Sequence, residues 1–183
     1  VDAGATTITT AVFTGTTITT ETPTPVLIGT QPGSQTVTQG QSVNFTGAAS
    51  GSSPLIYVWK KGTTTLSDTG TISGSSTATL MIANAQPADE GSYTVTVSNA
   101  LPSSETSTAA TLTVNTPATI ATQPADQTTV VGTPATFSVV AAGKPNTFTY
   151  QWKKGTTDIP GATNASYSVS SPQLADSGST YQV

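Results

Sequence analysis

The residue types that most often carry out chemistry in proteins are scarce in this chain. It contains no cysteine and no histidine, and all five of its cations are lysines. A serine or threonine nucleophile needs a neighbouring base to activate it, and a thiolate nucleophile or metal site needs cysteine. The sequence therefore predicts a protein that is not an enzyme and that uses no cofactor.

The acidic residues remain as candidates for acid–base chemistry or cation binding. Of the nine acidic side chains, only Asp89 and Glu90 are adjacent, and they lie in a segment that we interpret as a turn. Calcium takes about six to eight oxygen ligands, often from closely spaced carboxylates. Because no Asp-x-Asp-x-Asp-Gly loop is present, we expect no metal site.

The motif Trp-Lys-Lys-Gly occurs twice and has two interpretations. Lys60–Lys61 and Lys153–Lys154 could form a cationic binding patch, or they could discourage a strand edge from pairing with another chain. We favour the second interpretation. The net charge of −4 and the lack of a basic stripe exclude nucleic-acid binding, which needs clustered cations for phosphate.

Three tyrosines and two asparagines are candidate ligand and modification sites. Tyr57, Tyr150 and Tyr167 could stack on sugars, but the first two lie two residues before a tryptophan, on the same strand face, and are expected in the core. A surface glycan or a host protein stays open as a ligand. Asn44 and Asn164 begin Asn-x-Ser/Thr sequons and are candidate glycosylation sites.

An internal repeat organises these residues. Residues 30–51 match residues 122–143 at a shift of 92, and the two Trp-Lys-Lys-Gly motifs match at a shift of 93. Near the end of each copy, Pro-Ala-Asp-Glu-Gly-Ser-Tyr corresponds to Leu-Ala-Asp-Ser-Gly-Ser-Thr-Tyr. Repeats of this length indicate diverged copies of one small domain.

Within each copy the apolar residues alternate with polar ones. Val43 and Phe45 share one strand face, as do Leu80 and Ile82, while glycine, proline, asparagine and aspartate recur between such runs. A period of two indicates strands with one buried face. We therefore predict an all-β protein built of two tandem Greek-key sandwiches.

The sequence resembles the disulfide-free, immunoglobulin-like repeats of bacterial extracellular proteins. The residues that carry this resemblance are a glycine before the second strand, a tryptophan in the third, and Asp-x-Gly-x-Tyr in the sixth; they include Trp59, Asp89, Gly91, Tyr93, Trp152, Asp176, Gly178 and Tyr181. The resemblance covers about residues 30–183. It implies that each tryptophan fills the space between the sheets and that each tyrosine hydroxyl bonds to the backbone just upstream.

Two departures from the family pattern have physical consequences. The positions that a disulfide joins in antibody domains are aligned with Gly47 and Val95 in the first copy, and with Val139 and Val183 in the second. The family aspartate often pairs with an arginine, and this chain has none. Asp89 must therefore rely on hydrogen bonds or on a lysine. One extra residue between Gly178 and Tyr181 predicts a bulge or a shifted register in the second copy.

The two ends of the sequence suggest complementary features. Residues 1–25 are rich in threonine, and residues 16–32 align with residues 108–124, the last strand of the first copy and the connection after it. Ile8, Val12 and Ile18 are therefore candidates for an intersubunit strand. The second copy stops about 19 residues before the first copy does. Either the chain is an excerpt from a longer array, or the first strand of one subunit completes the open domain of the next.

The predicted division is residues 1–25 as an extended segment, 26–115 as the first domain and 116–183 as an incomplete second domain. A connection over 114–124, which Pro117 and Pro124 stiffen, joins the two domains.

The leading hypothesis is a non-enzymatic structural or adhesive protein, extracellular or on the cell surface, acting as a repeat stalk or filament subunit. Its expected partners are copies of itself or neighbouring repeats, without membrane insertion. Alternatives are an accessory binding module of a secreted enzyme, or a virion surface decoration.

Overall fold

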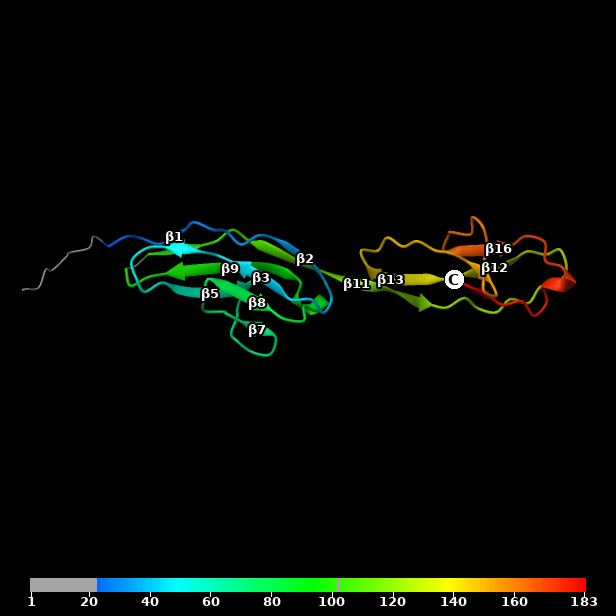
Figure 1. Ribbon diagram of the computed structural model, residues 1–183, viewed down its shortest axis with the longest axis horizontal. Helices are drawn as coiled ribbons and strands as arrows, with labels where there is room; N and C mark the ends of the chain where they lie inside the picture. Colours follow the sequence, from blue (N-terminus) through cyan, green and yellow to red (C-terminus); the bar gives the residue numbers. More distant parts are fainter. Residues whose placement is uncertain (1–22, 102) are drawn as a thin grey trace, which may run out of the picture.

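The computed structural model describes residues 23–101 and 103–183. These residues form strands in an elongated molecule, with two groups of strands following each other along the long axis (Figure 1). Within the described residues the only helices are two 3₁₀ turns, η1 (Pro87–Asp89) and η2 (Leu174–Asp176). None of the described helices is long or apolar enough to cross a membrane. The all-β prediction is confirmed.

The N-terminal group of strands is a sandwich. One sheet consists of β3 (Val43–Thr46), β8 (Thr79–Ile82) and β7 (Ile72–Ser73). The facing sheet is built on the order β6 (Thr64–Thr65), β5 (Ile56–Lys61), β9 (Gly91–Ser98) and β11 (Ala110–Thr122), with β10 (Ser104–Thr106) on β9 and β2 (Gln35–Thr38) parallel to β11. The short β1 (Leu27–Ile28) pairs with β4 (Ala49–Ser50).

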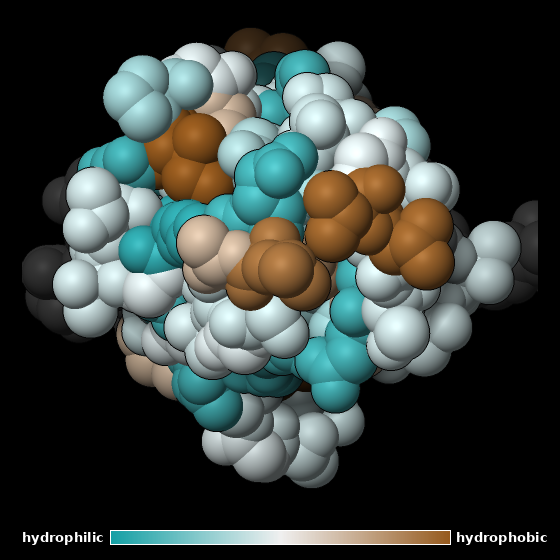
Figure 2. All heavy atoms as spheres, turned by 90° about the vertical axis from the view of Figure 1, so that its right-hand side faces the viewer, coloured by the Kyte–Doolittle hydropathy of each residue, from teal (hydrophilic) through white to brown (hydrophobic). Residues whose placement is uncertain are grey.

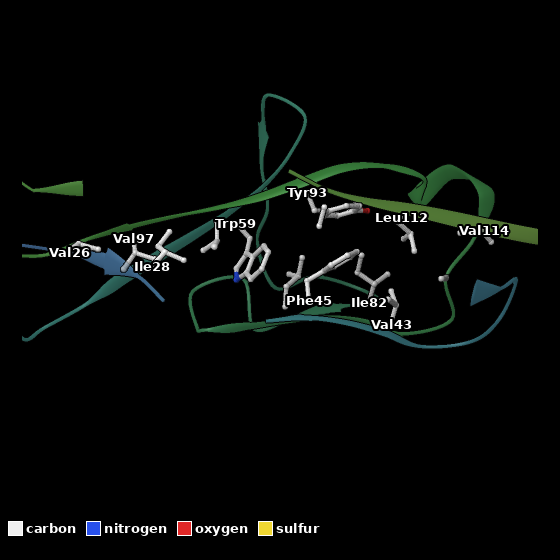
Figure 3. Packing of buried hydrophobic residues seen from close by; sticks show 14 residues of the cluster. Val26, Ile28, Val43, Phe45, Trp59, Ile82, Tyr93, Val97, Leu112 and Val114 are labelled. Atoms are coloured by element: carbon white, nitrogen blue, oxygen red, sulfur yellow. The ribbon is translucent and has the colours of Figure 1, made fainter. Parts of the chain in front are cut away.

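Alternating side chains from both sheets fill the space between them. Phe45 of β3 stacks on Tyr93 of β9, with 4.9 Å between the ring centroids. Figure 3 shows Trp59 beside these rings, with Leu112 and Val114 of β11 closing one end of the core. The period-two pattern predicted for these strands is therefore the pattern of burial, because alternate side chains of a strand point to opposite faces.

The C-terminal group of strands repeats this plan with fewer paired residues. The strands β12 (Ala135–Ser138) and β16 (Ser166–Val169) form one layer, and β15 (Thr157–Asp158), β14 (Lys153–Lys154) and β17 (Tyr181–Gln182) form another. Its buried cluster is Val139, Trp152 and Ala162. The strand β13 (Val140–Lys144) pairs with β11.

The strand β11 belongs to both groups. Its first half pairs with β9 and β2, and its second half, from Thr116 to Thr122, pairs with β13. This differs from the predicted proline-stiffened connection, because most of that segment is part of a β-ladder. Pro117 is accommodated where the pairing with β13 shifts register between Thr116 and Thr119, a position that does not need its missing N–H.

Candidate functional site

The two signature tryptophans occupy matching places in the two groups of strands. Trp59 and Trp152 are fully buried, and each indole N–H donates a hydrogen bond of 2.9 Å to a backbone carbonyl, that of Thr77 and of Asn164 respectively. A buried indole with its N–H satisfied stabilises a core without a penalty for the polar atom. Both tryptophans are therefore structural.

The turn before β9 holds Tyr93 in a corner. The Tyr93 hydroxyl donates a 2.6 Å hydrogen bond to the carbonyl oxygen of Asp89, and the Asp89 carboxylate accepts one of 2.8 Å from the backbone N–H of Gln86. Burial, with a smaller effect of the Asp89 charge, raises the pKa of Tyr93 to about 12. The hydroxyl therefore stays a proton donor at physiological pH.

The matching turn before β17 uses a lysine. The Asp176 carboxylate accepts hydrogen bonds from the backbone N–H of Gln173 at 2.9 Å and from Lys154 Nζ at 2.6 Å. These two bonds hold the pKa of Asp176 below its ordinary value, and the bond to Asp176 raises the pKa of Lys154. No bond from the Tyr181 hydroxyl to the backbone occurs in the described part of the chain; instead, Lys154 Nζ lies 5.8 Å from the centroid of its ring.

The glycines of these two turns differ in conformation. Gly91 has φ +149° and Gly178 has φ +77°, both positive values that side chains disfavour. The segments that follow these glycines also differ in length, because two residues separate Gly178 from Tyr181 and one separates Gly91 from Tyr93. The predicted shift of register in β17 does not occur, because Tyr181 pairs with Lys154 as Tyr93 pairs with Lys61. A bulge upstream of Tyr181 stays a prediction.

The positions aligned with the antibody disulfide hold apolar contacts. A Cβ on Gly47 would lie 2.6 Å from Cγ1 of Val95, so the two positions face each other closely across the sandwich. In the C-terminal group Val183 packs against the cluster that contains Val139.

In the part of the chain that the structure describes, charged groups form surface pairs rather than one convergent site. Lys144 pairs with Glu90, Lys153 with Asp158 at 3.1 Å, and Lys154 with Asp176 at 2.6 Å. Within the described ranges, no three acidic side chains come close enough together to hold a metal ion.

Asp68 is held by a turn rather than by a lysine. Hydrogen bonds from Ser75, first from its side chain and second from its backbone N–H, lower the pKa of Asp68.

The lysines of the repeated motif do not gather into one patch. Lys61 Nζ donates to the carbonyl oxygen of Ala88, and Lys153 and Lys154 are engaged in the ion pairs above. Both lysine pairs lie on strands that are paired on both sides, β5 between β6 and β9 and β14 between β15 and β17. The interpretation that they keep an open strand edge from pairing is therefore wrong.

The candidate modification and donor residues are only partly described. Asn44 lies exposed on β3, with its side chain directed away from Val43 and Phe45, and Asn164 is exposed between β15 and β16. The candidate intersubunit residues Ile8, Val12 and Ile18 lie outside the described residues. Glycosylation and strand donation stay predictions.

Two hollows lie along β17, in the copy that the sequence predicts to be incomplete. The larger, of about 310 Å³, is bordered by the 127–131 segment, Phe137, Leu174 and Tyr181. The smaller, of about 220 Å³, is bordered by Ile120, Val139, Tyr150 and Val183, with neighbouring residues. The repeat alignment contained a signal for them, because it equates several of these residues with core residues of the N-terminal group.

Comparison with known proteins supports the fold. Residues 26–114, just under half of the chain, match the family described as the Immunoglobulin I-set domain. No curated protein matches the chain in sequence.

Among solved structures, an I-band fragment of titin is similar with a TM-score of 0.66 and 20% identity, over 86% of this chain and 63% of the fragment. The four N-terminal Ig domains of Dscam1 isoform 6.9 are similar with a TM-score of 0.60 and 22% identity, over 85% of this chain and 40% of theirs. The chain thus spans less than two thirds of either structure. These likenesses confirm the immunoglobulin-like fold, whereas the bacterial source stays a prediction.

Proposed function

We propose that this chain is a non-enzymatic structural module of the cell surface, a segment of a stalk or filament that holds its ends at a fixed separation. The division into a first domain at 26–115 and a second at 116–183 is part of this proposal. The described residues support it in one respect: Asp68, Asp89 and Asp176 are engaged in turns, and Lys144, Lys153 and Lys154 are engaged in ion pairs.

The observation that carries the proposal is the shared strand β11. Thirteen residues run without interruption from the ladder with β9 and β2 to the ladder with β13. Backbone hydrogen bonds on both sides of the junction fix its dihedral angles, whereas a free linker would leave them variable. A module joined in this way resists bending between its two halves.

A charged clamp supports the same junction. Glu90, at the end of η1, accepts a 2.6 Å hydrogen bond from the backbone N–H of Val114 in β11 and forms an ion pair with Lys144 of β13. One side chain therefore connects the corner of the N-terminal group, the shared strand and the C-terminal group.

The rigidity can be measured with two spin labels. Because the chain lacks cysteine, Thr64→Cys and Thr157→Cys place single labels at equivalent exposed positions in the two halves. We expect a narrow distribution of distances in dilute solution by double electron–electron resonance. Inserting Gly-Ser-Gly between Asn115 and Thr116 should broaden it, since the ladders would no longer be continuous.

The matched control inserts the same three residues at the exposed turn between Thr69 and Gly70, where the distribution should stay narrow. A broad distribution in the unmodified pair of labels would show a flexible connection and contradict the proposed function.

A further inference from the structure

Equivalent core residues are covered to different extents in the two halves. Phe45 and Tyr93 are 1% exposed, whereas their counterparts Phe137 and Tyr181 are only half-buried. Similarly, Ile28 is 5% exposed and its counterpart Ile120 is 42% exposed. The C-terminal half therefore leaves open apolar surface that the N-terminal half buries.

Two segments cover this surface in the N-terminal half. Leu112 and Val114 of β11 belong to the same buried cluster as Phe45 and Tyr93, and their strand runs between β9 and β2. At the other end of the sandwich, Val97 of β9 lies against Val26 and Ile28 (Figure 3). The places of these side chains correspond to the two hollows of the C-terminal half.

The two hollows follow each other along the chain from Tyr181 to Val183. The strand β17 pairs with β14 on one edge, and no described strand pairs with its other edge. Tyr181 borders the larger hollow and Val183 the smaller one. We call these two hollows, with the open edge of β17 between them, the strand groove.

Exposed hydrophobic side chains surround the larger hollow. Val130, Val131 and Leu174 are 71%, 56% and 82% exposed, and all three border it. Figure 2, which views the end of the molecule that carries η2, shows hydrophobic residues gathered on this face. An open strand edge beside such residues favours the addition of another strand.

The start of the described chain indicates which strand fits. In β1, Ile28 pairs with Ala49 and Leu27 with Ser50; in β11, Ile120 pairs with Ala141 and Thr119 with Ala142. All of these positions are related by the repeat shift of 92, so β1 is the counterpart of the second half of β11. The first half of β11, which lies on the preceding unit, then corresponds to residues 18–23.

We propose that the strand groove binds the N-terminal segment, residues 8–22, of a second copy of this chain, so that copies join head to tail. This inference rests on the proposed structural function and names its partner. The segment would run antiparallel to β17, as β11 runs antiparallel to β9. Such addition does not close on itself and builds a filament.

In the register of the repeat, Ile18, Thr20 and Thr22 would take the places of Ala110, Leu112 and Val114. Ile8, Val12 and Ile18 all occupy even positions, with threonine at 10, 14 and 16 between them. In an extended strand these residues share one face, which is apolar or β-branched throughout. The segment carries one acidic residue, Glu21, and no cation.

A matched pair of variants tests the groove. Val131→Asp places a charge in the larger hollow. Val140→Asp is the control, because Val140 borders neither hollow and its exposed fraction, 55%, nearly equals the 56% of Val131. By mass photometry of the full chain, Val131→Asp should reduce assembly at least about tenfold and Val140→Asp should leave it unchanged. Circular dichroism checks that both variants fold. Equal assembly of the two variants would overturn the proposal.

Cysteine trapping tests the occupant and its register. The repeat places Thr19 opposite Thr180, as Thr111 lies opposite Ser92. A mixture of Thr19→Cys and Thr180→Cys chains should form a crosslinked dimer on a non-reducing gel in which each chain contributes one cysteine. The proposal that residues 8–22 occupy the strand groove is wrong if such mixed dimers are no more abundant than dimers of either variant alone. It is also wrong if a chain carrying Ile8→Asp, Val12→Asp and Ile18→Asp assembles normally.

The two proposals fail separately. The spin-label distances are measured on dilute monomers and report on β11, whereas assembly and crosslinking report on the strand groove. Narrow distances without assembly would refute the strand groove and leave the structural function standing, and broad distances would refute the structural function.

Discussion

At the scale of single residues, close packing takes the place of a disulfide in the N-terminal sandwich. Gly47 and Val95 occupy the positions that a disulfide joins in antibody domains, and the absence of a side chain at Gly47 lets Val95 and Trp59 pack against the backbone. The N-terminal core thus gains close packing in place of a crosslink. The contribution of a crosslink would be about 2–4 kcal/mol.

Gly47→Ala should lower the free energy of unfolding by about 1–3 kcal/mol, because overpacking a rigid core costs that much. The new Cβ would lie 2.6 Å from Cγ1 of Val95, a buried β-branched side chain with little freedom to move. Urea denaturation measures the change. Gly33→Ala is the control, since no atom lies within 4 Å of its added Cβ. Equal stability of the two variants would contradict this account of the packing.

At the scale of elements, the junction depends on one strand and one carboxylate. The strand β11 supplies the backbone, and Glu90 joins it to β13 through Lys144. The hydrogen bond from Lys144, followed by that from the Val114 N–H, lowers the pKa of Glu90 from its ordinary value of 4.5. The ionised form is therefore the one that the folded junction favours.

The sign of the pH effect follows from this lowered pKa. The contribution of Glu90 to stability is present above about pH 4.5 and is lost as the pH falls through the lower pKa of the folded state. Glu90→Gln should lack this part of the acid transition in thermal denaturation followed from pH 6 to pH 2. Lys144→Gln should weaken the same dependence. If the acid transition of both variants equals that of the parent chain, the clamp has no role.

At the scale of the whole molecule, the two halves are unequal. The N-terminal half buries a cluster that includes Trp59, Phe45 and Tyr93, while the buried cluster of the C-terminal half is Val139, Trp152 and Ala162. Since burial of apolar surface is the main favourable term in folding, the halves should differ in local stability.

Hydrogen exchange followed by mass spectrometry should detect this difference. In dilute solution we expect amides of β12, β14 and β16 to exchange at least about tenfold faster than those of β3, β5 and β9, because opening these strands exposes less apolar surface. Uniform protection along the described chain would show that the smaller cluster is sufficient. Assembly through the strand groove should slow exchange in the C-terminal half selectively.

The sequence by itself determined the local features of this protein. Alternation in runs such as 43–46 and 79–82 identified strands and their buried faces, because the side chains of a strand alternate regardless of what covers them. The family resemblance implied that Trp59 and Trp152 fill the space between the sheets, and both are buried. The absence of cysteine and histidine excluded whole classes of chemistry without any structure.

Only the tertiary structure decided how the two halves are joined and which residues line the open surface. The strand β11 pairs with strands of both halves, and Glu90 contacts Lys144, 54 residues away in the sequence. Both features depend on pairing between distant segments, which no local pattern specifies. The same holds for Phe137 and Tyr181, whose sequence pattern matches that of Phe45 and Tyr93. Their burial differs because cover comes from a neighbouring strand, and the presence of that strand is a property of the fold rather than of the residue.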